Sequence, residues 1–251
     1  MIKDRPSFPA IKTQMAPGPE LSVVMPCYNE CEGIESVIRE WGAFLSEESV
    51  SFELIVINDG STDGTGRILD RLRRLLPELR VVHQLRTGHG KALRRGYEVA
   101  RGQFILQVDS NGRYEPSDFV RMWEKRQNFD LILAHRTHRL DSMLRRAICT
   151  LLCKIACYFF GVRLSDPNVP FRLFSKERAE TIFEKLPNNV ISTNLLTSLM
   201  IQKHAPDRVL ELPVPFRLRP RGKVTLSLLG YAKLCLIHLA ELTRLRFAMT
   251  S

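Results

Sequence analysis

Short apolar runs alternate with amphipathic segments along the first half of the chain. Each run is almost continuously apolar, which is typical of parallel strands that are buried on both faces. The segments between the runs repeat their apolar residues at helical spacing, as from Ile34 to Leu45. This repetition predicts an α/β fold with a mostly parallel, Rossmann-like central sheet flanked by helices. The five predicted strands are residues 21–26, 52–58, 79–84, 103–109 and 130–135.

The second half of the chain has longer and less regular patterns. Helices are predicted at about 140–162 and 192–204, and residues 166–177 predict a turn followed by a short strand. Residues 211–225 combine prolines with basic residues and predict a basic loop.

No linker-like stretch separates the two halves. We therefore expect one domain over residues 21–225, with lobes at 21–116 and 117–225. The prolines of residues 1–20 predict a flexible arm, and residues 226–251 predict a C-terminal amphipathic helix.

The chain is basic, with 37 Lys and Arg against 27 Asp and Glu and a net charge of +10. This balance favours an anionic partner, which can be a nucleic acid, a nucleotide or an acidic membrane surface. The basic residues are scattered, with no RNP-like motif or zinc-finger spacing, and this argues against nucleic acid. No secretory signal pattern and no run of about 18–20 apolar residues occurs, and the six cysteines fit a reducing compartment. We expect a cytoplasmic protein, soluble or peripheral to a membrane.

Polar residues follow the first two predicted strands. LSVVMPCYNE ends in Pro26, Tyr28, Asn29 and Glu30, and LIVINDGSTDGT carries Asp59 at its strand end. Because ligands of open α/β sheets bind beyond the carboxyl ends of the strands, these residues predict one nucleotide pocket. Tyr28 offers a face for stacking and Asp59 could accept a base imide N–H. The alternative is that Asn29 and Glu30 serve only as a helix cap and first turn.

The third strand end is QFILQVDSNGRYEP. It brings Asp109 and Asn111 to the same edge of the sheet. Two oxygen ligands at i and i+2 suit Mg²⁺ or Mn²⁺ that is already bridged by a diphosphate. An ordinary Asp-Ser-Asn-Gly turn explains the same residues equally well.

Together these three segments resemble the inverting family 2 glycosyltransferases of the GT-A fold, which use nucleotide-diphospho-sugars. TGHGKALRRGYEVARGQ resembles the glycine-containing helix of that family. GVRLSDPNVPFRLFSKE and PFRLRPRGKV resemble the branch akin to dolichyl-phosphate mannose synthase, which moves a sugar onto a polyprenyl phosphate. The resemblance runs from about residue 20 to 225, so that 21–116 would be a nucleotide lobe and 117–225 an acceptor lobe.

The resemblance also implies roles for individual residues. Base and ribose would be held by Pro26, Tyr28, Asn29, Glu30 and Asp59, with Lys91 near the nucleotide. Asp109 would contact the ribose or the metal, and Asn111 stands where the family has its principal metal carboxylate. Arg172, Arg217, Arg221 and Lys223 would face phosphates of donor or acceptor, unless they form only a solvated basic face.

The chain departs from the family at two places. The acidic D-x-D motif reads D-S-N, and Arg113 follows two positions later. An amide oxygen removes one charge from a hard-cation site, while a guanidinium can bind a diphosphate directly. We expect metal dependence to be weakened or lost, with Arg113 partly substituting. The VPF sequence before Arg172 also departs from the usual small residues, which leaves the acceptor open.

The expected chemistry follows from the charges. An acceptor phosphate is already anionic, so its attack on the donor sugar needs no strong general base. A hydroxyl acceptor does need one, and Asp166 is then the first candidate. Asp109, Asn111, Asp166 and Arg172 are thus the predicted catalytic set.

Two alternatives remain for the function: transfer to a soluble glycan or metabolite hydroxyl, or a catalytically weakened nucleotide-sugar-binding protein. A lipid acceptor requires contact with a membrane. The basic residues of two amphipathic segments predict peripheral contact. They are Arg145, Arg146, Lys233, Arg244 and Arg246.

Overall fold

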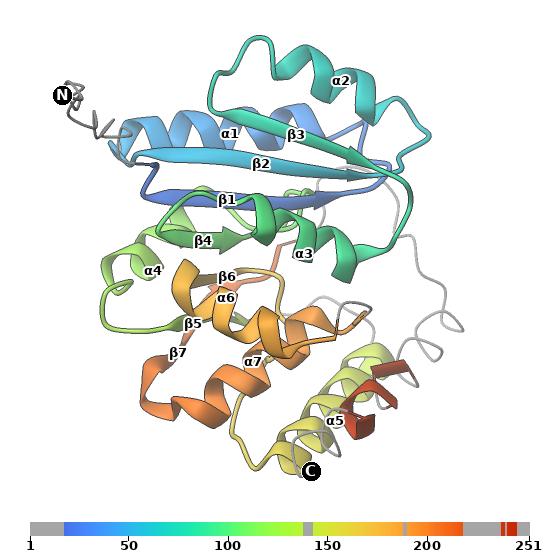
Figure 1. Cartoon of the computed structure of the whole chain (residues 1–251), viewed down its shortest axis with the longest axis vertical. Helices are drawn as coiled ribbons and strands as arrows, with labels where there is room; N and C mark the ends of the chain where they lie inside the picture. Colours follow the sequence, from blue (N-terminus) through green and yellow to red (C-terminus); the bar gives the residue numbers. More distant parts are fainter. Residues whose placement is uncertain (1–17, 138–142, 188–189, 218–236, 239, 245–251) are drawn as a thin grey trace, which may run out of the picture.

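The computed structural model describes residues 18–137, 143–187, 190–217, 237–238 and 240–244. A seven-stranded sheet crosses the molecule, in the order β3-β2-β1-β4-β6-β5-β7 (Figure 1). β6 is antiparallel to both of its neighbours, and all the other pairs are parallel. The strands are β1 (Leu21–Cys27), β2 (Phe52–Asp59), β3 (Leu79–Gln84), β4 (Phe104–Gln107), β5 (Leu131–Thr137), β6 (Arg172–Ser175) and β7 (Val209–Pro215). The predicted α/β fold with a mostly parallel sheet is confirmed.

β7 corrects the first part of the predicted basic loop at 211–225, because residues 211–215 belong to this strand, while residues 218–225 lie outside the described residues. Residues 209–215 pair in parallel with β5, and Leu212 and Val214 face the core. Pro213 and Pro215 concealed the strand, because proline removes a ladder hydrogen bond. Proline is tolerated here since β7 is the last strand of the sheet.

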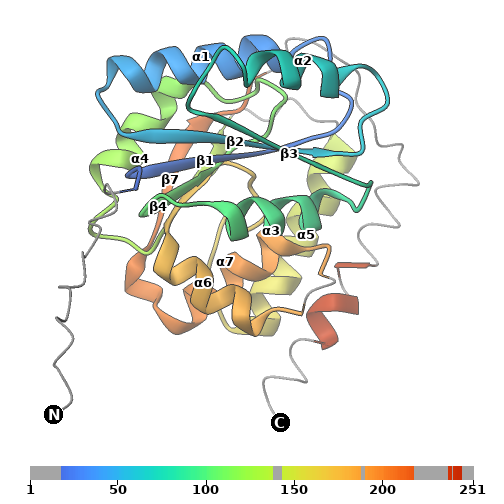
Figure 2. The ribbon, with the colours of Figure 1, turned by 45° about the horizontal axis from the view of Figure 1, so that its top comes forward.

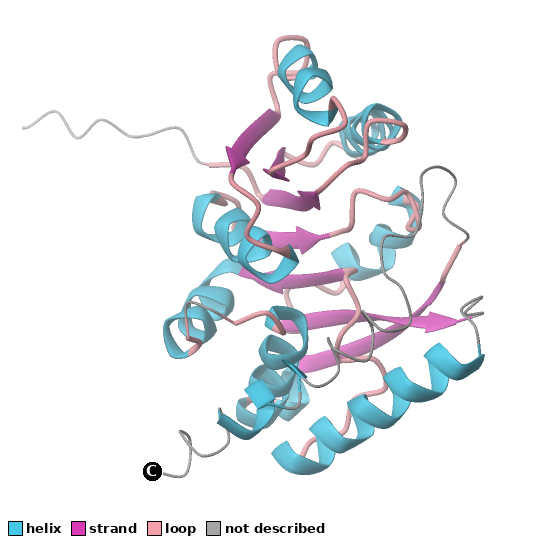
Figure 3. Cartoon of the chain, turned by 90° about the vertical axis from the view of Figure 1, so that its right-hand side faces the viewer, coloured by secondary structure: helices cyan, strands magenta, loops and turns pink. Residues whose placement is uncertain are grey.

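Helices cover both faces of the sheet. α1 (Ile34–Glu47) and α2 (Thr65–Leu72) lie on one face, and α3 (His89–Val99), α6 (Lys176–Lys185) and α7 (Thr193–His204) lie on the other (Figure 2). The short η1 (Pro116–Phe119) and α4 (Val120–Glu124) follow β4, and η2 (Pro206–Arg208) precedes β7. The predicted helix at 140–162 is α5 (Met143–Phe160), which lies along one side of the molecule (Figure 3).

Aromatic residues fill the core on both faces of the sheet. Trp41 of α1 packs edge-on against Phe119 and Phe171, with ring centroids 6.4 and 6.2 Å apart. On the other face, Gly96 lets α3 approach the sheet closely. A Cβ at this position would lie 2.3 Å from a side-chain carbon of Val24, so only glycine fits without a shift.

The predicted arm at 1–20 and the predicted helix at 226–251 lie largely outside the described residues. Residues 240–244 are helical, and Glu241 accepts the backbone N–H groups of Ile191 and Ser192 at the start of α7. Within the described part of the chain, none of the helices combines the length and the apolar character needed to cross a membrane.

Candidate active site

The carboxyl ends of β1 and β2 form one hydrogen-bonded edge. The strands are parallel, with Cys27 opposite Asn58, so the loops after them leave the sheet side by side. Asn29 adopts a left-handed conformation (φ 54°) in the turn after β1. Four hydrogen bonds join the loops: Asn29 N to Ser61 Oγ (3.0 Å), Glu30 N to Thr65 Oγ1 (2.9 Å), Cys31 N to Asp63 Oδ2 (3.1 Å) and Thr62 N to Asn29 Oδ1 (2.8 Å). The two polar strand ends therefore lie together, as the sequence predicts.

Asp59 closes β2 and is 2% exposed. Its carboxylate accepts hydrogen bonds from Gln84 Nε2 (2.8 Å), Arg86 Nη1 (2.9 Å), Thr87 N (2.8 Å), Thr87 Oγ1 (2.9 Å) and Gly88 N (2.9 Å). Burial alone would raise the pKa of Asp59, but the bonds from Gln84, Thr87 and Gly88 hold the pKa below its usual value. Asp59 thus anchors the loop between β3 and α3, and a nucleobase can bond to it only by replacing one of these donors.

Arg86 belongs to this edge, although the sequence did not single it out. Its guanidinium carbon lies 3.3 Å from the centroid of the Tyr28 ring, while the same group pairs with Asp59. Gly60 (φ 70°) permits the approach, because a Cβ there would lie 2.7 Å from Arg86 N. The stacking face predicted at Tyr28 is therefore covered by a cation in this structure. Lys91 lies exposed in the first turn of α3.

The loop after β4 meets the same edge. Ser110 Oγ donates to the carbonyl of Pro26 (2.9 Å), which ties this loop to the end of β1. Glu30 and Asn111 line one pocket, together with Ser110 and the first turns of α1. Glu30, which is predicted to bind the nucleotide, and Asn111, which is predicted to bind the metal, therefore line the same pocket.

Asp109 and Asn111 contact each other within this loop. Asn111 Nδ2 donates to Asp109 Oδ2 (3.3 Å), and Asn111 Oδ1 accepts from Arg113 N (3.2 Å). His89, the first residue of α3 and absent from the predicted set, lies 3.3 Å from the other Asp109 oxygen. Among the described residues, no three His, Cys, Asp or Glu side chains are grouped to hold a metal ion. The donor set present, one carboxylate and one amide oxygen, fits only an ion that takes most of its ligands from a diphosphate.

Asp166 is paired with Arg136, which is absent from the predicted site residues. Arg136, near the end of β5, donates to both Asp166 oxygens at 2.5 and 2.8 Å, and both side chains are largely buried. Glu211 of β7 in turn accepts the backbone N–H groups of Ser165 (2.9 Å) and Asp166 (3.1 Å). Both oxygens of Asp166 are thus engaged by Arg136 in this structure.

The guanidinium groups of two arginines lie against the ring of Phe216, the residue that follows β7. The guanidinium carbon of Arg113 lies 4.8 Å from the ring centroid, and that of Arg136 lies 5.3 Å from it. Arg113, from the loop after β4, is thereby brought to the same aromatic side chain as Arg136. This cationic pair joins the two predicted lobes at the site.

The prediction that Arg172 faces a phosphate, or else lies on a solvated surface, does not agree with its surroundings. Arg172 is 1% exposed and donates to Val169 O (2.9 Å), Pro167 O (3.2 Å), Asn194 O (2.8 Å) and Ser198 Oγ (3.0 Å). Burial lowers its pKa to about 10. The side chain holds the turn before β6 against α7, because every one of these acceptors belongs to one of those two segments.

Arg217 is also engaged within the protein. It pairs with Glu115 (2.7 Å) and Asp118 (2.5 Å) of the segment after β4. Arg221 and Lys223, the other two basic residues predicted to face phosphates, lie outside the described residues, as do Lys233 and Arg246.

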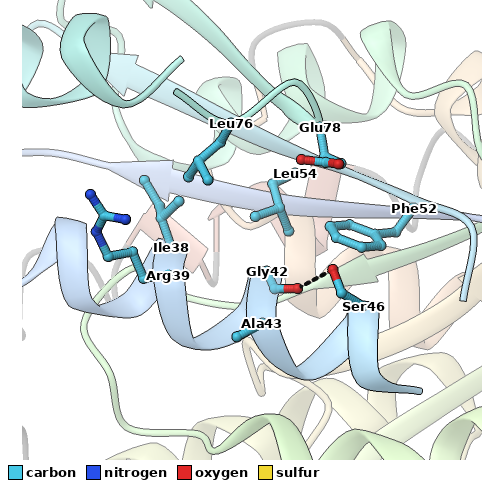
Figure 4. A pocket seen from close by; sticks show the side chains of 9 residues that line it. All are labelled: Ile38, Arg39, Gly42, Ala43, Ser46, Phe52, Leu54, Leu76 and Glu78. Carbon is cyan, nitrogen blue, oxygen red and sulfur yellow. Dashed lines mark hydrogen bonds between the residues drawn. The ribbon is translucent and has the colours of Figure 1, made fainter. Parts of the chain in front are cut away.

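A separate pocket lies between α1 and β2, and its lining is mainly apolar (Figure 4). Phe52, one of the residues that line the pocket, is the first residue of β2, whereas Asp59 is the last residue of this strand. The pocket is therefore at the opposite end of the strand from the candidate site. The lining residues are Ile38, Arg39, Gly42, Ala43, Ser46, Phe52, Leu54, Leu76 and Glu78.

The sequence is similar to one known family and to characterised members of it. The profile of a family described as "Glycosyl transferase family 2" matches residues 22–188. A dolichyl-phosphate beta-glucosyltransferase of Dictyostelium discoideum is 30% identical over 187 residues, which are 66% of this chain and 57% of the relative. An undecaprenyl-phosphate 4-deoxy-4-formamido-L-arabinose transferase of Pseudomonas fluorescens is 25% identical over 159 residues, 62% of this chain and 47% of the relative. The chain thus spans about half the length of these relatives.

Solved structures resemble the fold. The glucosyl-3-phosphoglycerate synthase of Mycobacterium tuberculosis, crystallised with Mn²⁺, uridine-diphosphate-glucose and phosphoglyceric acid, superposes with a TM-score of 0.66. The match covers 90% of this chain and 80% of the synthase chain at 22% sequence identity. At this identity the likeness concerns the fold alone.

Proposed function

The chain belongs to glycosyl transferase family 2, with the GT-A fold expected from its sequence, and from this we propose that it transfers a sugar from a nucleotide-diphospho-sugar to a polyprenyl phosphate. The observation that carries the proposal is the single edge formed by the ends of β1, β2 and the loop after β4. The lipid-phosphate acceptor is supported by the names of two relatives, which act on dolichyl and undecaprenyl phosphates.

We assign the donor to this edge. Tyr28 would stack with the base, Asn29, Glu30 and Asp59 would contact base or ribose, and Asp109 with Asn111 would hold a Mg²⁺ or Mn²⁺ ion. Such an ion neutralises the charge that develops on the leaving diphosphate. Because Asn111 supplies an amide where a carboxylate is usual, Arg113 would carry part of that task through direct contacts with phosphate oxygens.

The acceptor chemistry is mainly electrostatic. Arg136, fixed by both oxygens of Asp166, and Arg113 on the shared ring of Phe216 provide two cations for an acceptor phosphate. Their role would be to hold the anionic nucleophile in line with the donor sugar, which permits displacement with inversion. Since the nucleophile carries its charge already, Asp166 would remain the partner of Arg136 throughout.

We further propose that α5 contacts the lipid surface. Tyr158 is 86% exposed and Leu151 is 60% exposed, so α5 presents two large side chains to solvent. They lie seven residues apart, so both occupy one side of the helix, with Lys154 between them. Amphipathic segments of this composition lie in the interface without spanning it. We propose in addition that the transfer takes place at the cytoplasmic face of a membrane.

A transfer assay with matched variants tests the function. UDP- and GDP-sugars are offered with detergent-dispersed undecaprenyl phosphate, dolichyl phosphate or a soluble glycan, and lipid products are identified by mass spectrometry. We expect product from one donor class and a polyprenyl phosphate, strongly reduced by Asp109→Ala. Asp207→Ala, at the opposite end of β7 from Phe216, is the control. Donor hydrolysis without transfer to any lipid phosphate would contradict the proposed acceptor.

A further inference from the structure

Tyr114 is a buried tyrosine in the loop between β4 and η1, beside the candidate site. Its side chain is 3% exposed, and its ring stacks on Phe171 with centroids 4.8 Å apart and an interplanar angle of 19°. The ring also lies 6.0 Å from that of Phe216. Among the described residues, none offers a hydrogen-bond partner to Tyr114 Oη. The aromatic ring is therefore packed against other side chains, whereas its hydroxyl lacks a hydrogen-bond partner among the described residues.

An unpartnered buried hydroxyl is costly, because it has lost its hydrogen bonds to water without replacing them. Buried tyrosines normally find a partner for this group. The same chain shows the usual solution at Tyr97, whose buried hydroxyl donates to Gln107 Oε1. Among the described residues, Tyr114 therefore differs from Tyr97 in having no partner for its buried hydroxyl.

The charges around Tyr114 indicate the nature of a partner for this hydroxyl. Burial raises the pKa of Tyr114 above its usual value. Arg136 and Arg113 act against this, and Asp109 and Asp166 add to it. The hydroxyl is thus a proton donor at neutral pH and requires an acceptor atom. Two of these residues, Arg113 and Arg136, are assigned above to the phosphates, Asp109 is assigned to the metal, and Asp166 is the partner of Arg136.

Contacts with Phe216 relate the position of the Tyr114 ring to the positions of the two guanidinium groups. Arg113 and Arg136 lie against the Phe216 ring, and the Tyr114 ring is the neighbour of both Phe216 and Phe171. A phosphate is a ligand that can accept from two guanidinium groups and a hydroxyl donor together, since its oxygens accept several hydrogen bonds.

We propose that Tyr114 Oη donates a hydrogen bond to a phosphate oxygen of a bound substrate that Arg113 and Arg136 also contact. This inference rests on the proposed function. The phosphate can belong to the diphosphate of the donor or to the monophosphate of the acceptor. Tyr114 is then a substrate-binding residue. Its unpartnered hydroxyl lowers the stability of the free protein and gains its hydrogen bond when the ligand binds.

The test uses Tyr114→Phe, which removes only the hydroxyl, and Tyr97→Phe as the matched control. We expect free Tyr114→Phe protein to melt at or above the wild-type temperature, since no protein hydrogen bond is lost. Free Tyr97→Phe protein should melt lower, because Gln107 loses its partner. Ligand affinity should show the reverse pattern, with loss in Tyr114→Phe and no change in Tyr97→Phe.

Two ligand arms, both measured by calorimetric titration, distinguish the sources of the phosphate. UDP and GDP probe the donor diphosphate, and farnesyl phosphate, with farnesol as its phosphate-free control, probes the acceptor. Tyr114→Phe should weaken the binding of one of the phosphate ligands by about tenfold or more, as expected for the loss of a hydrogen bond to a charged group. The binding of farnesol should be unaffected.

Each remaining outcome overturns a defined statement. If the wild type binds a nucleotide or farnesyl phosphate, and Tyr114→Phe binds the same ligands as tightly as the wild type does, the role assigned to Tyr114 is wrong. The proposed function then still stands. If free Tyr114→Phe melts well below the wild type, the hydroxyl already has a partner in the free protein and the inference fails. If the wild type binds neither nucleotide nor farnesyl phosphate, the proposed function itself fails.

Discussion

The guanidinium of Arg86 lies on the ring of Tyr28, with its central carbon 3.3 Å from the ring centroid. This is the separation of stacked planar groups, and it occurs on the residue expected to stack with a nucleobase. Arg86 is at the same time paired with Asp59 at 2.9 Å, so a base that stacks on this face of Tyr28 has to displace it.

Arg86→Ala is therefore expected to tighten the binding of UDP or GDP by about 2–5-fold. An exposed cation–π contact is worth about 0.5–1 kcal/mol, and its loss removes the competition with the base. Asp59 keeps its bonds from Gln84, Thr87 and Gly88 in this variant. Calorimetric titration measures the change, with Arg74→Ala as a control of equal charge. Weaker binding by Arg86→Ala would instead mean that Arg86 contacts the bound nucleotide.

Asp63 should make stability depend on acidic pH. Burial would raise the pKa of Asp63, but hydrogen bonds from Thr65 and Cys31 lower it to about 2. Because the folded-state pKa lies below the unfolded value, this carboxylate stabilises the fold above about pH 4, and the contribution is lost as pH falls towards about 2.

Asp63→Asn is expected to lower the free energy of unfolding at pH 7 by about 1 kcal/mol, a figure reduced for the exposure of the side chain. The difference from the wild type should shrink as pH falls from about 4. Urea unfolding at pH 7, 4 and 3 measures this, with the exposed Asp207→Asn as control. A constant difference at all three values would contradict the expectation.

Asn111→Asp should restore a stronger metal site. A second carboxylate beside Asp109 repels it in the free protein, and a divalent ion relieves that repulsion. We expect Mn²⁺ to bind about tenfold more tightly or better, measured by electron paramagnetic resonance of the free ion. Unchanged Mn²⁺ affinity would exclude Asn111 from the metal site.

Arg113 should account for nucleotide binding that survives without metal. Wild-type protein is expected to retain part of its UDP or GDP affinity in EDTA, and Arg113→Ala is expected to lose that part. The measurement is a thermal-shift titration with and without EDTA, in which bound ligand raises the melting temperature. Complete loss in EDTA for the wild type, with Arg113→Ala unaffected in the presence of Mn²⁺, would contradict this.

Asp166→Asn separates positioning from general base catalysis. We expect the free energy of unfolding to fall by about 2–4 kcal/mol, because Arg136 is largely buried and loses its charged partner. The KM of the phosphate acceptor should rise while kcat stays within about tenfold. A general base would instead cost about 10²–10⁴ in kcat. Asp130→Asn, which breaks the pairs with Arg178 and Arg208 at the start of β5, should lower stability without the KM effect.

The sheet was largely predictable, because parallel strands buried on both faces are continuous apolar runs. β7 was missed since its prolines conceal an edge strand, and α6 was missed since its sequence, KERAETIFEK, has only a weak apolar face. The polar strand ends followed directly from the strands, because each lies within a few residues of one.

The contacts that complete the site were not predictable from one sequence. Arg86, Arg136 and Tyr114 gain their roles from residues distant in the chain, as when Arg136 meets Asp166. Arg172 was misassigned for a related reason. Three of its four acceptor residues use backbone carbonyl oxygens, and a carbonyl carries no signal in the sequence.

β6 is hydrogen-bonded to β4 on one side and to β5 on the other. The two lobes are therefore not modules joined by a hinge, because one short strand belongs to the ladders of both. A chain ended at residue 116 would leave β4 with an open edge, which is a template for aggregation. The two predicted lobes should accordingly unfold in one cooperative transition. A second lobe taken from another protein could be grafted on only if it brought its own equivalent of this strand.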